Sequence, residues 1–271
     1  DCDDTVAGAE VGAEERCDGV DNNCDQVVDE GCTGPTDHTG TLTSDEIWTE
    51  QGGPHRLTGD VTVPVGVTLT IEPGVTVTAG SGDEIFVEGT LWAIGTADDL
   101  VVFTSDKATP TPGSWYGIDF KNGSTGGIRF AEVLYANVGV RMYASTAFVR
   151  DSMIGFSSSY GVQLEAGPPV GGDVAGRFVR NTITGGISYP VYADVDRATL
   201  LDGSNSFIGN GTDKIYVWTP PHQYSSTALN QDLTLQALDV PYRMASHLYF
   251  GGDTAPTLTI GAGSELHFRG G

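Results

Sequence analysis

A four-residue pattern recurs in the middle of the chain at an equal spacing of 22 residues. Glycine is followed by an apolar, a polar and an apolar residue at positions 117–120, 139–142 and 161–164, and the register continues less regularly at 190–193 and 214–217. In a β-strand this pattern sends two side chains to one face and one to the other. A unit this short cannot enclose a core, so its copies must stack. We therefore expect a parallel β-helix whose inward column, with coils about 4.8 Å apart, consists of Ile118, Val140, Val162, Val191 and Ile215.

A β-sandwich is the simpler alternative, because it also contains evenly spaced short strands. Sandwich hairpins join antiparallel strands through two-residue turns about every 8–12 residues. Here the repeated unit is a whole coil, and the variable insertions 165–176 and 219–230 fall at corresponding places. The fixed period therefore favours the β-helix.

The charge balance restricts the partners of the chain. Its 271 residues include 36 acidic residues against 13 lysines and arginines, and the net charge is −23. Such an acidic surface disfavours nucleic acid and anionic membranes as partners, and it suits a protein that holds divalent cations. No apolar run approaches the roughly 20 residues that cross a bilayer. We expect an extracellular or cell-surface protein with no transmembrane segment in this chain.

The first 33 residues form a separate small unit. They contain all four cysteines and eleven acidic residues against one arginine. A unit of this size cannot bury enough apolar surface to fold unaided, so it needs disulfides, metal or both. A bound cation would also relieve the repulsion among the carboxylates. Oxidised cysteines would place the protein outside the cytoplasm. The four cysteines are Cys2, Cys17, Cys24 and Cys32.

Acidic and amide residues alternate between these cysteines as in a calcium-binding loop. Calcium loops space their ligands by two because alternate residues of a tight loop point inward. Gln26 stands at position 6, which is normally glycine, and Cys32 stands at position 12 in place of the bidentate glutamate, so the loop is not a true EF-hand. A second half-pattern opens the chain. The predicted calcium ligands are Asp1, Asp3, Asp21, Asn23, Asp25, the Val27 carbonyl, and Asp29 or Glu30.

Residues 1–4, 17–25 and 29–32 resemble the MopE-type metal-binding repeat of large bacterial surface proteins, because cysteines and acidic residues agree in order. That repeat is similar in style to thrombospondin type 3 calcium repeats. The resemblance covers about 32 of the 271 residues and implies a calcium site that includes Asp18. Copper is associated with one family member, but this head lacks histidine and tryptophan, so copper is not carried over. Departures at residues 6, 7 and 26 imply that one or two ligands are missing.

A solvated acidic linker stapled by cystines is the alternative for this head. Random acidic tails do not alternate Asp-x-Asn-x-Asp between cysteines, which argues against it. Four cysteines allow three pairings, and all three stay open. Cys2–Cys24 with Cys17–Cys32 is favoured because Cys2 and Cys24 sit between ligand positions and should point away from the ions.

Residues 34–47 are polar and rich in turn formers, so we expect a linker with a solvated His38. Order resumes near Trp48, and residues 48–271 are predicted to form the β-helix. The apolar residues that alternate at its start are Val61, Val63, Val65, Leu69, Ile71, Val75 and Val77.

Residues 66–77, 89–91, 103–105 and 115–118 resemble the right-handed parallel β-helix regions of secreted and outer-membrane proteins. The resemblance spans most of residues 48–271 and implies a mainly β, pectin-lyase-like fold. It does not imply one function, because lyases, hydrolases, adhesins and structural spacers share this scaffold.

Two outward columns accompany the inward one. The first reads Asp119, Arg141, Gln163, Tyr192 and Tyr216, and the second reads Lys121, Tyr143, Glu165, Asp194 and Trp218. A calcium-dependent polysaccharide lyase needs clustered acids and a basic residue that takes the proton, and the candidates are Asp119, Lys121, Arg141 and Glu165. Stacked strands also carry complementary charges simply to stabilise an exposed sheet. No histidine cluster or catalytic serine motif stands out, so we expect a protein without lyase activity.

Four outward aromatics could instead bind a glycan by stacking, or could be covered by the two insertions. These residues are Tyr143, Tyr192, Tyr216 and Trp218. We expect a structural or adhesive β-helix protein whose partner is an extracellular polysaccharide or a surface protein. A carbohydrate-active enzyme such as a polysaccharide lyase is the alternative.

The end of the chain repeats its beginning. Residues 241–244 echo 54–57, and residues 257–260 echo 68–71. We therefore expect more coils beyond residue 271. An open last coil would expose a strand edge that invites end-to-end assembly.

Overall fold

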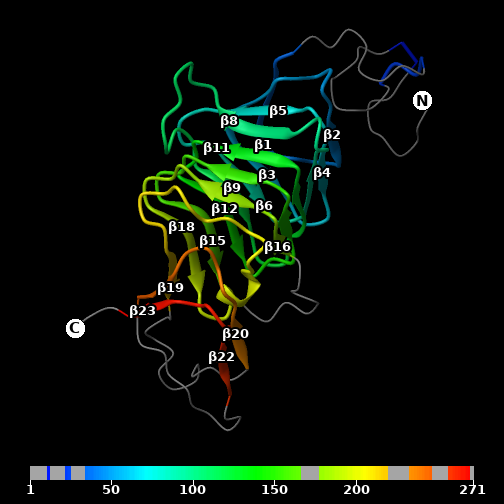
Figure 1. The fold of residues 1–271 in the computed structure, drawn as a ribbon. Helices are drawn as coiled ribbons and strands as arrows, with labels where there is room; N and C mark the ends of the chain where they lie inside the picture. The colour runs from blue at the N-terminus through cyan, green and yellow to red at the C-terminus, as the bar shows by residue number, and fades with distance from the viewer. Residues whose placement is uncertain are drawn as a thin grey trace.

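The computed structural model describes residues 11–12, 22–25, 34–165, 177–218, 232–245 and 256–268. Figure 1 shows short strands stacked along one axis, with the N-terminal coils at one end and the C-terminal coils at the other. Neighbouring strands pair in parallel, and each coil contributes strands to up to three faces. The predicted parallel β-helix is confirmed.

Strand β3 (His55–Val63) is long enough to cross two faces. Its first part, at His55, pairs with β5 on the first face, and its last part, at Val61, pairs with β6 on the second face. It also pairs with β1 (Thr36–Thr41), which forms the first coil. The first face continues with β5 (Thr76–Ala79), β8 (Val101–Ser105), β11 (Ala131–Leu134), β14 (Met153–Gly155) and β17 (Thr182–Thr184).

The second face is the longest. It continues from β3 through β6 (Glu84–Val87), β9 (Gly117–Phe120), β12 (Val138–Tyr143), β15 (Tyr160–Glu165), β18 (Tyr189–Asp194), β19 (Ile215–Trp218), β21 (Tyr242–Met244) and β23 (Leu266–Phe268). The third face consists of β2 (Glu46–Trp48), β4 (Thr68–Ile71), β7 (Thr90–Ile94), β10 (Thr125–Arg129), β13 (Phe148–Arg150) and β16 (Phe178–Val179). A 3₁₀ turn, η1 (Ala198–Leu200), follows β18, and β20 (Leu233–Leu235) pairs with β22 (Leu258–Ile260).

The inward column is continuous and buried. The pairing of β9, β12, β15, β18 and β19 places its members opposite one another, and each is at most 1% exposed. This confirms the column predicted from the recurring four-residue pattern. Its members are Ile118, Val140, Val162, Val191 and Ile215.

Two glycines of the repeated pattern are required by the first face. A Cβ at Gly139 would lie 2.3 Å from Cγ2 of Ile154, and one at Gly161 would lie 2.2 Å from Cγ2 of Ile183. Both isoleucines are buried side chains of first-face strands. At Gly139 and Gly161 the two faces therefore meet too closely for a side chain, whereas a Cβ at Gly117 would lie 1.8 Å from the Val138 carbonyl oxygen of the neighbouring strand β12.

Three expectations are wrong. Residues 34–47 are not a linker, because β1 and β2 lie within them and pair with β3 and β4; the strands look polar because much of this terminal coil is exposed. Val65 is not inward but 80% exposed, since it lies in the turn between β3 and β4. Residues 242–244 lie on the second face, whereas residues 55–57 lie on the first. The sequence similarity between these two segments therefore does not correspond to equivalent positions in the β-helix.

Candidate functional site

The outward surface of the second face is the candidate site. Strand pairing aligns Arg141 with Asp119, Gln163 with Arg141, and Tyr192 with Gln163 and Tyr216. The predicted first outward column is therefore observed. It extends to Phe86 before Asp119 and to Arg243 after Tyr216.

A charge cluster occupies one half of this column. Nη1 of Arg141 donates to Oδ2 of Asp119 at 2.9 Å and to Oε1 of Glu84 at 3.3 Å, while Nζ of Lys121 donates to Oδ2 of Asp119 at 2.5 Å. The Asp119 side chain is only 2% exposed. Burial raises the pKa of Glu84, and the nearby negative charge of Asp119 adds to that rise. The cations and carboxylates in this cluster therefore largely neutralise one another.

Glu165 does not join this cluster. Its Oε1 accepts a hydrogen bond from Nε2 of Gln163 at 2.6 Å, and Oε1 of Gln163 in turn accepts from Nε of Arg141 at 3.4 Å. Of the four candidate catalytic residues, Lys121 and Arg141 thus both pair with Asp119. Glu165 is linked to Arg141 only through the side chain of Gln163. The guanidinium of Arg141, the candidate base, is engaged by the carboxylates of Asp119 and Glu84. The geometry supports the stabilising role of stacked charges more than proton abstraction.

An aromatic cluster occupies the other half. The rings of Tyr192 and Tyr216 stack with centroids 5.6 Å apart and planes inclined by 17°. Tyr160 lies 5.3 Å from Tyr192, Tyr189 lies 5.2 Å from Tyr216, and Trp218 lies 6.3 Å from Tyr192. All five side chains are half-buried, so the cluster is partly accessible to solvent. The cluster covers the outer surface of β15, β18 and β19.

The sequence identified three of these rings and missed two. Tyr143, the fourth predicted aromatic, is 39% exposed on β12 and has no ring contact with the cluster among the described residues. Tyr160 and Tyr189 were missed, although the 29-residue spacing that aligns Val162 with Val191 also aligns these two tyrosines. Arg243 was missed as well; its guanidinium lies 5.6 Å from the Tyr189 ring and 5.9 Å from the Tyr216 ring.

Two tyrosines of the cluster, Tyr160 and Tyr192, have raised pKa values. Burial raises the pKa of Tyr192, and the carboxylates of Asp194 and Glu165 raise it further. Burial and the neighbouring Tyr216 raise the pKa of Tyr160. Uncharged, partly desolvated rings with their hydroxyls at one edge are the surface on which a sugar ring stacks.

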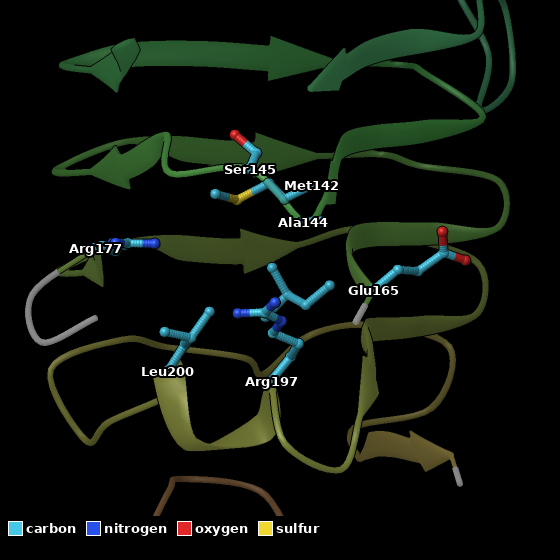
Figure 2. Close-up of a pocket in the computed structure, with 8 residues that line it drawn as sticks. Met142, Ala144, Ser145, Glu165, Arg177, Arg197 and Leu200 are labelled. Carbon is cyan, nitrogen blue, oxygen red and sulfur yellow. The ribbon is translucent and has the colours of Figure 1, made fainter. Parts of the chain in front are cut away.

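A small pocket opens beside this surface, at the corner after the second face (Figure 2). Its volume of about 10 Å³ is that of a single water molecule. Figure 2 shows Arg177 and Arg197 extending toward the pocket and the carboxylate of Glu165 directed away from it. The pocket is too small for a sugar, so it is not the candidate binding site. It is lined by Met142, Ala144, Ser145, Leu164, Glu165, Arg177, Arg197 and Leu200.

Only two predicted calcium ligands, Asn23 and Asp25, lie among the described residues. Oδ1 of Asn23 accepts a hydrogen bond from the Asp25 backbone N–H at 2.9 Å, which forms a tight turn. The described residues contain no group of three or more His, Cys, Asp or Glu side chains arranged for a metal ion. The remaining predicted ligands, and the cysteine pairing, lie outside the described part of the chain and stay predictions.

His38 is not solvated, and a histidine cluster does exist. His38 stacks on Trp48 with centroids 4.0 Å apart, and its Nε2 lies 2.8 Å from Nδ1 of His55. Trp48 and His55 are fully buried. These residues belong to β1, β2 and β3, so the expectation failed because the supposed linker is a coil. His267 pairs with Glu265 on the second face, and His222 lies outside the described residues.

Two parts of the chain match known families. Residues 40–129 match the pectate-lyase like beta helix domain. This β-helix domain match runs from the end of β1 to the end of β10, about a third of the chain. Residues 1–30 match a MopE-type model described as "Putative metal-binding motif". Both resemblances inferred from the sequence are confirmed.

No curated protein and no solved structure matches the chain. The two family matches fit a secreted or surface β-helix protein with a metal-binding segment, and they do not distinguish a binding protein from an enzyme. Among the described residues there is no helix with the length and apolarity needed to span a bilayer.

Proposed function

We propose that this protein is a rigid extracellular or cell-surface β-helix that binds a polysaccharide on the aromatic half of its second face. The observation that carries the proposal is the contact network of Tyr160, Tyr189, Tyr192, Tyr216 and Trp218. Five contacting, half-buried rings on the outer surface of one sheet exceed what scattered surface aromatics produce.

The fold keeps these rings in place before any ligand binds. Each ring projects from a strand whose backbone pairs on both sides, and the inward neighbours Val191 and Ile215 are fully buried. Little side-chain entropy is therefore lost on binding. The hydroxyls at the ring edges can donate to sugar oxygens while the ring faces contact C–H groups.

The alternative of a polysaccharide lyase has less support. A base must be free to accept a proton near neutral pH. Arg141 is paired with Asp119 and Glu84, and Lys121 is paired with Asp119. In this proposal the charge cluster stabilises the sheet beside the binding surface.

Affinity electrophoresis of the whole chain tests glycan binding. Gels containing hydroxyethyl cellulose, xylan or polygalacturonate would be compared with gels that contain none. We expect one of them to retard the protein, and Tyr216→Ala to weaken that binding about five- to ten-fold, because an aromatic contact contributes about 1 kcal/mol.

Trp92→Ala is the matched control, since Trp92 is a 40% exposed aromatic on the third face. Equal loss in Tyr216→Ala and Trp92→Ala, or retardation by none of the three polysaccharides, would contradict the proposal. Formation of unsaturated sugar products that is lost in Arg141→Ala would favour the lyase instead.

We further propose that the N-terminal segment binds calcium through the oxygen ligands predicted above. The match of residues 1–30 to a metal-binding motif supports a metal, and the all-oxygen ligand set supports calcium over a softer ion. Titration calorimetry on the whole chain should show calcium binding in the 10⁻⁴–10⁻³ M range typical of extracellular modules. The variant Asp25→Asn should weaken it, whereas Asp98→Asn, in an exposed turn, should not. Binding of copper but not calcium would contradict this assignment.

A further inference from the structure

The strongest unexplained feature is the stack of His38, Trp48 and His55 in the first coils. The Trp48 and His55 rings are nearly parallel, inclined by 6° with centroids 5.2 Å apart, and His38 lies 4.0 Å from Trp48 and 5.1 Å from His55. Each ring comes from a different strand: β1, β2 or β3. The stack therefore ties the first coil to the coil that follows it.

The hydrogen bonds fix where the protons lie. Nε2 of His55 is 2.8 Å from the carbonyl oxygen of Thr49, which can only accept, so this nitrogen carries the hydrogen. In the neutral ring, Nδ1 of His55 then carries none, and it accepts the hydrogen of Nε2 of His38 at 2.8 Å. It follows that Nδ1 of neutral His38 has no hydrogen. Protonation of His55 at Nδ1 would place its N–H donor against the N–H donor at Nε2 of His38. The closed stack can therefore take up a proton only at Nδ1 of His38.

Burial and the neighbouring imidazole of His55 oppose that proton, whereas the nearby carboxylates of Asp37 and Glu46 favour it. Its side chain is 11% exposed, and burial together with the neighbouring His55 lowers its pKa from 6.5 to about 4, although Asp37 acts in the opposite direction. Oε2 of Glu46 faces Nδ1 of His38 at 4.0 Å and also accepts from Nε1 of Trp48 at 3.0 Å. Asp37 is itself neutralised by a bidentate pair with Arg56 of β3.

We infer that this stack is an acid-sensitive latch that holds the first coil on the rest of the β-helix. In the closed state His38 is neutral and stacked, whereas in an opened first coil it is solvated and takes up a proton freely. Mild acid therefore favours the open state of residues 36–48 while the later coils stay closed. Opening would change how the N-terminal segment is attached to the β-helix.

The direction and size of the effect follow from linkage. A histidine whose pKa is lowered on closing supports the closed state fully above pH 6.5, and this support is lost as the pH falls toward 4. Between pH 7 and pH 5 the closing equilibrium should weaken by about 20-fold through His38 alone. Opening also exposes His55 to protonation, which adds to the change.

Hydrogen exchange of the whole chain at pH 7 and pH 5, corrected for intrinsic rates, tests the latch. Protection of residues 36–48 should fall at least about 20-fold more than that of residues 84–94, which lie in a later coil. His38→Gln keeps an N–H donor for His55 but does not titrate, so its pH dependence should shrink by about this factor. The ratio between the two pH values is measured within each variant, so a lower protection of the variant at both pH values does not affect the test.

His267→Gln, on an exposed histidine of β23, is the control and should behave as the unmodified chain. A parallel loss of protection in residues 36–48 and 84–94 would overturn the proposal. So would a His38→Gln variant that keeps the full pH dependence.

Discussion

Two parts of the second face, the coils of β9 and β12 and the coils of β18 and β19, can be compared. Both have the same apolar interior, but the outer surface is charged in the first part and aromatic in the second. Inside, Ile118 and Ile215 are both at most 1% exposed and belong to one column. Outside, the first pair of coils presents Asp119 and Arg141, whose charges satisfy one another. The second pair presents Tyr192 and Tyr216, whose rings stack and keep an open side.

This difference shows what strand register does and does not decide. Register brings residues of successive coils to about 4.8 Å, and it does so equally for charges and for rings. Opposite charges at that distance neutralise each other, so their capacity for external partners is largely used. Rings at the same distance keep their outer faces and edges available, so the aromatic half is the part of the column suited to binding.

The interior column should be equally important in both halves. Ile118→Ala and Ile215→Ala each remove a fully buried side chain and should each lower the free energy of unfolding by about 4 kcal/mol. Urea unfolding followed by circular dichroism measures both. A difference of more than about 2 kcal/mol between the two variants would show that the halves differ inside as well as outside.

Breaking the charge cluster should have a smaller effect on stability. Arg141→Ala leaves the nearly buried Asp119 with Lys121 as its one remaining cation, so we expect a loss of about 2 kcal/mol. The matched control is Arg180→Ala, which removes a 56% exposed side chain and leaves Asp151 paired with Arg129, so it should cost less than about 1 kcal/mol. Equal losses in the same unfolding experiment would mean that the cluster is an ordinary surface pair.

The aromatic half should be recognisable by its resistance to alkaline pH. Burial raises the pKa of Tyr192 and Tyr160 above the ordinary value of 10, so their phenolates should form late in a titration followed at 295 nm. Because the folded state has the higher pKa, these residues support folding below pH 10, and that support is lost as the pH rises through their folded pKa. Tyr192→Phe should remove one late-titrating group and leave the early ones. Loss of an early group would instead place the Tyr192 hydroxyl in free solvent.

Features that depend on the repeat could be predicted from the sequence. The recurring four-residue pattern predicted the inward column, and the residue next to each of its members aligned Asp119 with Arg141 and Tyr192 with Tyr216. The spacing also aligns Tyr160 with Tyr189, which lie outside the two predicted outward columns. A period carries this information because every coil repeats the same backbone path, so position in the coil determines the face and the neighbour.

Contacts between residues at non-equivalent positions of the repeat were decided by the tertiary structure alone. Glu84 reaches Arg141 across 57 residues although it belongs to neither predicted column, because a long guanidinium can extend past the strand between them. Residues 34–47 were predicted to be a linker because this first coil is largely exposed and contains few apolar residues. His38, Trp48 and His55 obey no common spacing, and only the closing of the first two coils brings their rings together. The sequence by itself thus determined the coils and the columns of side chains that they stack. Contacts between residues that do not occupy equivalent positions in the repeat depend on the path of the chain in three dimensions, so only the tertiary structure decided them.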